Sequence, residues 1–448
     1  MRYVSTRGRA APRDFAGILL SGLAEDGGLT LPEAWPRLES VARKSYGDAA
    51  YEVLSRFAGD DGLRADIDAA YAGFDDAGIA PLVELGTGRY LLELFHGPTF
   101  AFKDIAMQVL SRLFARALAA RGGRATILAA TSGDTGSAAI AAFGGLANID
   151  LFVLHPKGRI SEMQRRQMTT AEFDNVHNIA LEGSFDDAQS IVKALLADAG
   201  FARASSLTAV NSINFARIAA QIVYYFAAAA RLDAAPVFVV PTGNFGDVFA
   251  GEAAMRMGLG VRGLVIATNE NDILVRTLDD GVYQPGAARH TLSPSMDIQV
   301  ASNFERALFE ASGRDAAWMD RVMREFAATR SLAIPGAILK ALRARYSAHA
   351  VSDAETLACI ARTYKMHDRL VDPHTAVAMA AADRLDTDAP VVVLSTAHPA
   401  KFPDAVRKAA GVEPAMPARL QALFFKPECC ETLPADAGAV RAFIESRI

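Results

Sequence analysis

The sequence predicts an α/β protein whose parallel sheets are flanked by helices. From about residue 86 onward, short runs of continuously apolar residues alternate with segments of helical spacing. Strands that are apolar along their whole length are typical of parallel sheets with both faces buried. Several of these runs lead into a loop that carries glycine. We expect strands at residues 89–95, 126–130, 149–154, 207–210, 237–240, 264–267 and 391–394.

Local helix signals agree with this alternation. An apolar stripe with i, i+3, i+4 spacing runs from Leu110 to Leu118 and stops at Gly122. Ser161 and Gln164 have the spacing of a capping box, which predicts the start of a later helix. The order strand, loop, helix therefore repeats along the middle of the chain.

The chain divides into three expected parts. Its 448 residues exceed the size of one ordinary domain of about 150 residues. Residues 1–85 show few strand patterns and are expected to form a small N-terminal domain. Residues 86–405 are expected to form the α/β region with two subdomains, and residues 406–448 a C-terminal extension. Within that extension, residues 426–438 are expected to form a loose tail.

Composition excludes several classes of protein. Apolar residues make up 51% of the chain and charged residues 22%, which excludes intrinsic disorder. The 46 basic and 51 acidic residues give a net charge of −5, so no electrostatic signal points to nucleic acid or to an anionic membrane. The longest apolar stretch, 218–230, is shorter than the roughly 20 residues that a bilayer requires.

The cysteines indicate a reducing compartment. Cys359, Cys429 and Cys430 cannot build a disulfide framework, and no Cys/His cluster suggests a metal site. We therefore expect a cytoplasmic protein without a bound metal.

The first candidate loop, 96–104, follows the first expected strand. Lys103 lies at a helix start, where the helix dipole favours anions over cations. Phe100 and Phe102 are expected to desolvate it, and a desolvated lysine loses its proton easily and can form a Schiff base. The alternative is an ordinary surface lysine beside a capping Asp104.

Two further loops suit anions. Residues 131–136, TSGDTG, place small residues before a helix and suit a carboxylate or phosphate, although an ordinary helix cap explains them equally well. Residues 241–247, PTGNFGD, allow the backbone to close around a phosphate. They lack the Walker lysine and the GxGxxG spacing, so a monophosphate such as that of pyridoxal phosphate fits better than a nucleotide. A purely structural turn is the alternative.

Two more strand ends carry polar side chains. Thr396 follows the last expected strand, and its hydroxyl can hydrogen-bond a heteroaromatic nitrogen. Asn214 and Arg217 lie three apart after strand 207–210, on one expected helix face, and arginine is a good clamp for an anion. In open α/β sheets ligands bind at the carboxyl ends of strands, so these loops are expected to form one site.

Five motifs in this order resemble one enzyme family. FHGPTFAFKD, ATSGDTGSAA, VNSINFARI, PTGNFGDVFAG and STAHP are similar to threonine synthases of the bacterial and fungal branch. The start of the chain, RYVSTRG with LAEDGGLTLP, resembles the N-terminal domain of that family, which explains the early arginines without a transit peptide. The resemblance spans residues 2–405 and implies a fold-type II pyridoxal phosphate enzyme, related to the tryptophan synthase β subunit.

The resemblance implies roles in holding the cofactor. Lys103 corresponds to the lysine that carries pyridoxal phosphate as a Schiff base and later shuttles protons. Thr396 matches the residue that faces the pyridine nitrogen. The phosphate-holding loop corresponds to Gly243, Asn244, Phe245, Gly246 and Asp247.

The resemblance also implies roles in binding substrate. Ser212 and Arg217, with Asn214 beside them, resemble the residues that bind the substrate phosphate in this family. Many fold-type II enzymes have asparagine where this chain has an aspartate in the TSGDTG loop, and an anion there would repel the 3′-oxygen of the cofactor. The loop that receives the substrate α-carboxylate corresponds to Ser132, Gly133, Asp134 and Thr135.

The implied reaction converts O-phospho-L-homoserine and water into L-threonine and phosphate. This is a γ-elimination followed by β-addition of water, the last step of threonine biosynthesis, catalysed by a carbon–oxygen lyase that acts on phosphates. The alternatives are a threonine-synthase-like phospho-lyase, a serine/threonine dehydratase, or a non-catalytic protein that binds a phosphorylated metabolite. The expected partner is a small molecule, with neither nucleic acid nor membrane, and the chain is expected to be a monomer or small homo-oligomer.

One stretch stays open between two interpretations. Residues 296–306 resemble a substrate-facing segment of the family, but they also fit a helix start capped by Asn303.

Overall fold

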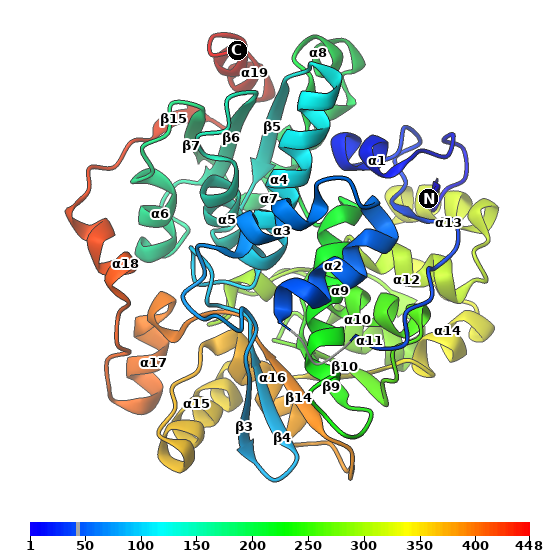
Figure 1. Cartoon of the computed structure of the whole chain (residues 1–448), viewed down its shortest axis with the longest axis vertical. Helices are drawn as coiled ribbons and strands as arrows, with labels where there is room; N and C mark the ends of the chain where they lie inside the picture. The colour runs from blue at the N-terminus through cyan, green and yellow to red at the C-terminus, as the bar shows by residue number, and fades with distance from the viewer. Residues whose placement is uncertain (42–44) are drawn as a thin grey trace.

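Two mainly parallel sheets form the framework of the protein. The computed structural model describes residues 1–41 and 45–448. One sheet lies in the upper half of Figure 1 and the other in the lower half. The lower sheet contains β3 (Leu82–Gly86), β4 (Arg89–Glu93), β9 (Val237–Pro241), β10 (Gly263–Thr268), β13 (Tyr346–Ala350) and β14 (Val391–Ser395). The upper sheet contains β5 (Ala125–Ala130), β6 (Ile149–Pro156), β7 (Val176–Glu182), β8 (Leu207–Thr208) and β15 (Glu431–Pro434).

The strand order brings distant parts of the chain together. The lower sheet has the order β13-β10-β9-β14-β4-β3, and the upper sheet β15-β7-β6-β5-β8. All neighbours in both sheets are parallel except β3 and β4, which form an antiparallel pair. The predicted α/β class with parallel sheets is thereby confirmed.

Helices cover both sheets. The first group is α1 (Phe15–Ser21), α2 (Tyr46–Ala58), α3 (Leu63–Tyr71), α4 (Lys103–Arg121), α5 (Asp134–Phe143), α6 (Glu162–Thr169), α7 (Phe185–Ala197), α8 (Ala199–Ala204), α9 (Phe215–Ala229) and α10 (Gly246–Met257). The second group is α11 (Ile273–Asp280), α12 (Phe304–Ala311), α13 (Ala316–Thr329), α14 (Gly336–Arg343), α15 (Asp353–His367), α16 (Pro373–Ala382), α17 (Pro403–Ala410), α18 (Ala418–Gln421) and α19 (Ala437–Glu445). Short elements complete the chain: β1 (Tyr3–Ser5), β2 (Thr30–Pro32), β11 (Val282–Tyr283), β12 (Leu332–Ala333), η1 (Pro294–Met296), η2 (Pro399–Lys401) and η3 (Ala422–Phe425).

Alternate residues of each central strand face different helix layers. In β9, Val239 packs in the cluster that contains α16, whereas Phe238 and Val240 belong to the main core, which contains α9 and α10. In β6, Phe152 faces the cluster of α7 and α19, whereas Val153 joins the main core. Because side chains alternate along a strand, only a strand that is apolar throughout satisfies both layers.

Helix α9 is the centre of the main core. It is the apolar stretch noted above, it is buried along nearly its whole length, and it packs against α2, α4 and α10. Within the described ranges, no helix combines the length and apolar character that crossing a membrane requires.

The N-terminal segment packs on the same core. Strands β1 and β2 pair antiparallel, and the hydroxyl of buried Tyr3 donates to the carbonyl of Phe57 at 3.0 Å. Thr6 donates to the Glu305 carboxylate at 2.6 Å, and Arg7 forms an ion pair with it at 3.1 Å. These contacts link the first residues of the chain to α12, which lies far from them in the sequence.

The structure contains the helix ends and strands that were predicted from local sequence patterns. Helix α4 ends at Arg121 with Gly122 in the left-handed conformation, and the Ser161–Gln164 capping box is formed. All seven expected strands exist, but β8 covers only Leu207–Thr208 because the chain then turns toward α9. Strands β3, β7, β13 and β15 were not anticipated; β7 has His177 and Asn178 inside its apolar pattern.

The expectation of a loose tail at 426–438 was wrong. Residues Glu431–Pro434 form β15, which pairs parallel with β7, and α19 begins at Ala437. Strand β15 is short, polar and contains proline, properties that an edge strand tolerates because only one side is hydrogen-bonded. Val440 and Ile444 then bury their side chains fully in the cluster of α7.

We expect Ile444→Ala to destabilise the upper sheet. Removing a fully buried isoleucine side chain costs about 2–5 kcal/mol, which lowers the Tm by several degrees. The matched control is Ile448→Ala, because Ile448 is half exposed at 50%. Thermal unfolding followed by circular dichroism measures both; equal Tm values would show that α19 adds nothing to the core.

Candidate active site

Loops from both sheets meet between them. The loop before α4 contacts the end of β14, where the Phe102 N–H donates to the Thr396 carbonyl at 2.8 Å. The same loop reaches the upper sheet, where Lys103 Nζ lies 3.7 Å from Oδ2 of Asp134, at the start of α5. Strand ends from two sheets therefore converge on Lys103, as the sequence predicted for the carboxyl ends of parallel strands.

Lys103 is the first residue of α4 and is nearly buried. Its side chain is 11% exposed, and Nζ lies 4.7 Å from the centre of the Phe102 ring. Burial lowers the pKa of Lys103, as do the charges of Arg217 and Lys401, while Asp134 and Asp247 oppose this shift. Such an amine gives up its proton readily and can act as a nucleophile.

The two phenylalanines of this loop take different places. Phe102 contacts Lys103, as expected. Phe100, with a positive φ of 59°, instead packs in a small cluster with Met163, Ala400 and Leu420.

The loop before α10, residues 241–247, is the one in which the sequence predicts a phosphate site. It packs tightly and is called the glycine cradle below. A side chain on Gly243 would meet the Ser295 carbonyl oxygen at 2.9 Å. Phe245 precedes α10 in the left-handed conformation, with φ 69°, and provides no side-chain cap. Asn244 donates to the Ser212 hydroxyl at 2.9 Å and accepts from the Gly246 N–H at 3.0 Å. The uncapped N-terminus of a helix and a backbone free of side chains suit a phosphate group.

The Asp247 carboxylate is not directed to this cradle. It accepts hydrogen bonds from the hydroxyls of Tyr224 and Tyr225 on α9. Burial raises the pKa of Asp247 to about 6, against the lowering effect of the two tyrosines. The Asp247 carboxylate thus links α10 to α9.

Arg217 is a buried cation without an acidic partner among the described residues. It is 3% exposed, its Nη1 donates to the Val210 carbonyl at 3.3 Å, and its Nε has no partner there. Burial lowers its pKa to about 10. A buried guanidinium is costly unless an anion meets it, so this position is suited to an anionic ligand.

Asn214 has a structural role in the folded chain. It is fully buried and is the N-cap of α9, with Oδ1 accepting from the Ala216 N–H at 3.0 Å. Its amide nitrogen donates to the Leu19 carbonyl at 2.8 Å. Asn214 therefore caps the helix that Arg217 lies on, and does not share one helix face with it.

The side chain of Thr131 stabilises the conformation of the TSGDTG loop. The Thr131 hydroxyl accepts from the N–H groups of Gly133 and Gly136, both at 2.9 Å. Gly133 has φ 138°, and a side chain there would collide with Gln164. The hydroxyls of Ser132, Thr135 and Thr396 make no hydrogen bond within the described part of the chain, so they are available to a ligand.

The Asp134 carboxylate has several partners that the sequence did not reveal. Lys401 Nζ lies 2.7 Å from its Oδ1. Gln164 donates to the same oxygen at 3.0 Å, and Ser295 donates to Oδ2 at 3.3 Å. Lys401 lies two residues after the STAHP motif, which follows a strand end, and this position is the signal in the sequence that pointed to it.

Two residues of the stretch 296–306 contact the candidate loops for anion binding. Helix α12 starts after Asn303, but the side chain of Asn303 makes no cap; its amide donates to the Asn244 carbonyl at 3.2 Å. Arg306 is fully buried and donates to the carbonyls of Ile213 at 2.6 Å and Thr30 at 3.3 Å. Arg306 thus links the N-terminal segment to the loop before Arg217, and Asn303 contacts the loop 241–247.

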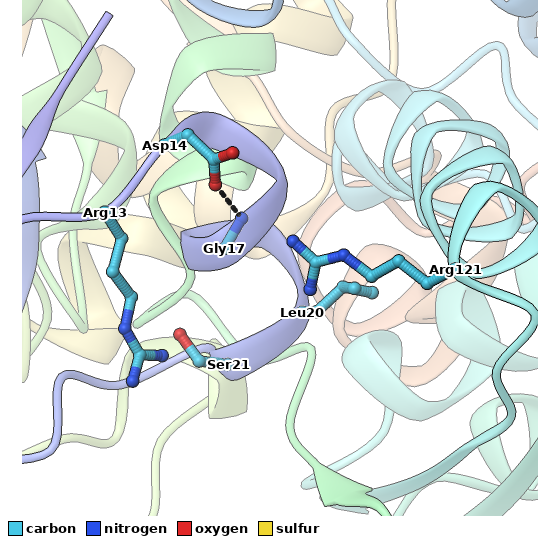
Figure 2. A pocket seen from close by; sticks show the side chains of 6 residues that line it. All are labelled: Arg13, Asp14, Gly17, Leu20, Ser21 and Arg121. Atoms are coloured by element: carbon cyan, nitrogen blue, oxygen red, sulfur yellow. Dashed lines mark hydrogen bonds between the residues drawn. The ribbon is translucent and has the colours of Figure 1, made fainter.

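A surface cavity of about 430 Å³ lies elsewhere, between α1 and the end of α4 (Figure 2). Within it the Asp14 carboxylate accepts from the Gly17 N–H at 2.7 Å, so this acid caps its own helix. Arg13 and Arg121 also line the cavity, which contains none of the residues predicted for the active site.

Comparisons with known proteins agree with this geometry. Three family models match: threonine synthase N terminus over residues 2–71, pyridoxal-phosphate dependent enzyme over 76–333, and threonine synthase C-terminal over 375–444. A threonine synthase of Pseudomonas aeruginosa is 48% identical, covering 99% of this chain and 98% of its own.

Solved structures give the same result. The pyridoxal-phosphate-bound threonine synthase of Brucella melitensis matches with a TM-score of 0.95 and 48% identity, covering 100% of this chain and 99% of the other. Yeast threonine synthase matches with a TM-score of 0.93 and 36% identity, covering 100% and 98%.

The middle model spans more than half of the chain, and the glycine cradle with its uncapped helix fits the phosphate that this class binds. The fold and site therefore define a fold-type II enzyme that depends on pyridoxal phosphate. Within that class, the chain belongs to the threonine synthase family. The resemblance seen in the motifs is confirmed.

We expect Gly243→Ala to weaken the binding of pyridoxal phosphate. The added methyl group would press on the backbone of Ser295 and Met296, and such overpacking costs roughly 1–3 kcal/mol, or about 5- to 150-fold in Kd. Gly263→Ala is the matched control, because a side chain there meets nothing within 4 Å. Fluorescence titration of the apoenzyme measures both, and an unchanged Kd in Gly243→Ala would contradict the cradle.

Proposed function

We propose that this enzyme converts O-phospho-L-homoserine and water into L-threonine and phosphate, as a carbon–oxygen lyase acting on phosphates. The observation that carries the proposal is Arg217, a buried cation without an acidic partner in the described chain, whose charge lowers the pKa of Lys103. A second anion-binding position, apart from the glycine cradle, is what a phosphorylated substrate requires. A dehydratase that acts on an unphosphorylated amino acid has no need of it.

We assign the cofactor to residues around Lys103. Its amine would hold the cofactor covalently, and the Thr396 hydroxyl would face the pyridine nitrogen. The backbone of Gly243–Asp247 would hold the cofactor phosphate; the close packing at Gly243 and the uncapped start of α10 support this assignment. When bound, pyridoxal phosphate supplies an electron sink that stabilises negative charge at the substrate α-carbon.

Other residues would orient the substrate. We assign the α-carboxylate to the loop of Ser132, Gly133 and Thr135, with its free hydroxyls and its N-terminal position on α5. Arg217 and Ser212 would grip the substrate phosphate, where a bidentate guanidinium suits a dianion better than lysine. Asn214 supports them as the cap of α9 rather than as a direct ligand.

Lys103 is the proposed acid–base group. Once free of the cofactor, its amine would take the α-proton and pass it to solvent. The neutral amine would then take a β-proton, and it would return a proton to the α-carbon at the end. A lowered pKa favours the unprotonated amine that the first of these transfers needs. Arg217 would hold the departing phosphate in place and stabilise its charge.

The products test this function directly. The holoenzyme incubated with O-phospho-L-homoserine is expected to release threonine and phosphate in equal amounts. Lys103→Ala is expected to abolish both products, because the other nearby amine, Lys401, is held by the Asp134 carboxylate and the Thr99 carbonyl and does not replace it as base. Phosphate released with 2-oxobutyrate instead of threonine would indicate a phospho-lyase, and no product would favour a non-catalytic binding protein.

A second prediction concerns Arg217. Arg217→Met is expected to raise the KM for O-phospho-L-homoserine at least 30-fold, since a lost charge-assisted contact in a buried site costs roughly 2–5 kcal/mol. The Kd for pyridoxal phosphate should stay within about threefold of wild type, a change of less than 1 kcal/mol. Arg262→Met, at an exposed arginine, serves as the control. An unchanged KM would remove Arg217 from the phosphate site.

We also propose a cytoplasmic location and a monomer or small homo-oligomer. The three cysteines are all free, which fits a reducing compartment. We retain the division at residues 85 and 405 as a proposal for the domain boundaries.

A further inference from the structure

Lys401 is a buried lysine at the edge of the active site. It ends η2, its side chain is 0% exposed, and its Nζ lies 2.7 Å from Oδ1 of Asp134. The same Nζ donates to the Thr99 carbonyl at 2.9 Å. Lys103 approaches the other oxygen of Asp134, at 3.7 Å. One carboxylate therefore lies between two lysines, and the closer one is Lys401.

Asp134 is held as an anion. Burial alone would raise its pKa, but the charges of Lys401 and Lys103 outweigh burial and hold the pKa of Asp134 well below its usual range. Gln164 and Ser295 supply further hydrogen bonds to its two oxygens. Without a counter-charge, such an anion would favour a proton on the Lys103 nitrogen.

The remaining charges near the pair are few and buried. Arg217 and Lys401 lower the pKa of Lys103, and Asp247 opposes them from the start of α10. On the far side of Lys401 lies Asp104, whose pKa burial raises to about 6 against the effect of Lys401. His398 also faces Lys401, and burial lowers its pKa to about 4, so it is neutral near pH 7.

We propose that Lys401 is a positioning residue. Its ammonium group neutralises the Asp134 carboxylate by pairing with the oxygen remote from Lys103, so that the Lys103 nitrogen can lose its proton at working pH. The inference rests on the proposed role of Lys103 in carrying the cofactor. Stability alone does not account for this lysine, because a buried ion pair adds little compared with an apolar pair of the same size.

The test is the pH dependence of the cofactor absorbance in the holoenzyme. The spectrum reports protonation of the Lys103 nitrogen that is joined to the cofactor. In Lys401→Met and Lys401→Gln, Asp134 loses its counter-charge, so the apparent pKa of that nitrogen is expected to rise by about one pH unit or more. In the double variant Asp134→Asn with Lys401→Met, both charges are gone and the pKa is expected to return close to wild type.

The control is Lys408→Met, at an exposed lysine of α17, which is expected to leave the spectrum unchanged. Equal pKa values in wild type and both Lys401 variants would overturn the inference. If both Lys401 variants fail to bind cofactor, recovery of binding and of the wild-type pKa in the double variant supports charge balance. Failure of the double variant as well would show a purely structural role for Lys401, which overturns the inference.

These outcomes are distinct from failure of the proposed function. A pH-dependent cofactor band that persists in Lys103→Ala would mean that another residue carries the cofactor. A band that is lost in Lys103→Ala but insensitive to Lys401 would leave the proposed function intact and remove only the role of Lys401.

Discussion

The site depends on charged groups that are buried in the space between two sheets. Lys103, Lys401 and Arg217 are all nearly or fully removed from water, and Asp134 forms ion pairs with the two lysines only. Arg217 remains without an acid in the described chain. Burying charge is costly, so we expect bound anions to stabilise this arrangement. We propose that the phosphate of the cofactor and the two acidic groups of the substrate are these anions.

The loop before Arg217 is held from outside the two sheets. Arg306 contacts the Ile213 and Thr30 carbonyls, and Glu305 beside it binds Thr6 and Arg7. The N-terminal segment therefore supports the loop that leads to Arg217, although it contributes none of the groups that we assign to the chemistry. This explains why a segment with few strand patterns packs so closely on the main core.

Features that depend on residues close together in the sequence were predictable, whereas contacts between distant residues were not. Strands 149–154 and 237–240 were predictable because continuous apolar runs have few other solutions, and the Ser161–Gln164 capping box is a local contact. Asn214 was placed on a helix face because the spacing alone does not tell a cap from the first turn. Lys401 lies 267 positions from Asp134 in the sequence, and no local pattern joins the two.

The pairing of β15 with β7 has a consequence for the order of folding. The upper sheet carries the loop of Asp134, yet its outer strand comes from residues 431–434, far along the chain from its partner β7. During synthesis, the N–H and C=O groups on that side of β7 stay unpaired until residues 431–434 emerge. Until then the sheet has an open edge. The arrival of β15 closes the sheet and removes a surface on which two nascent chains can join.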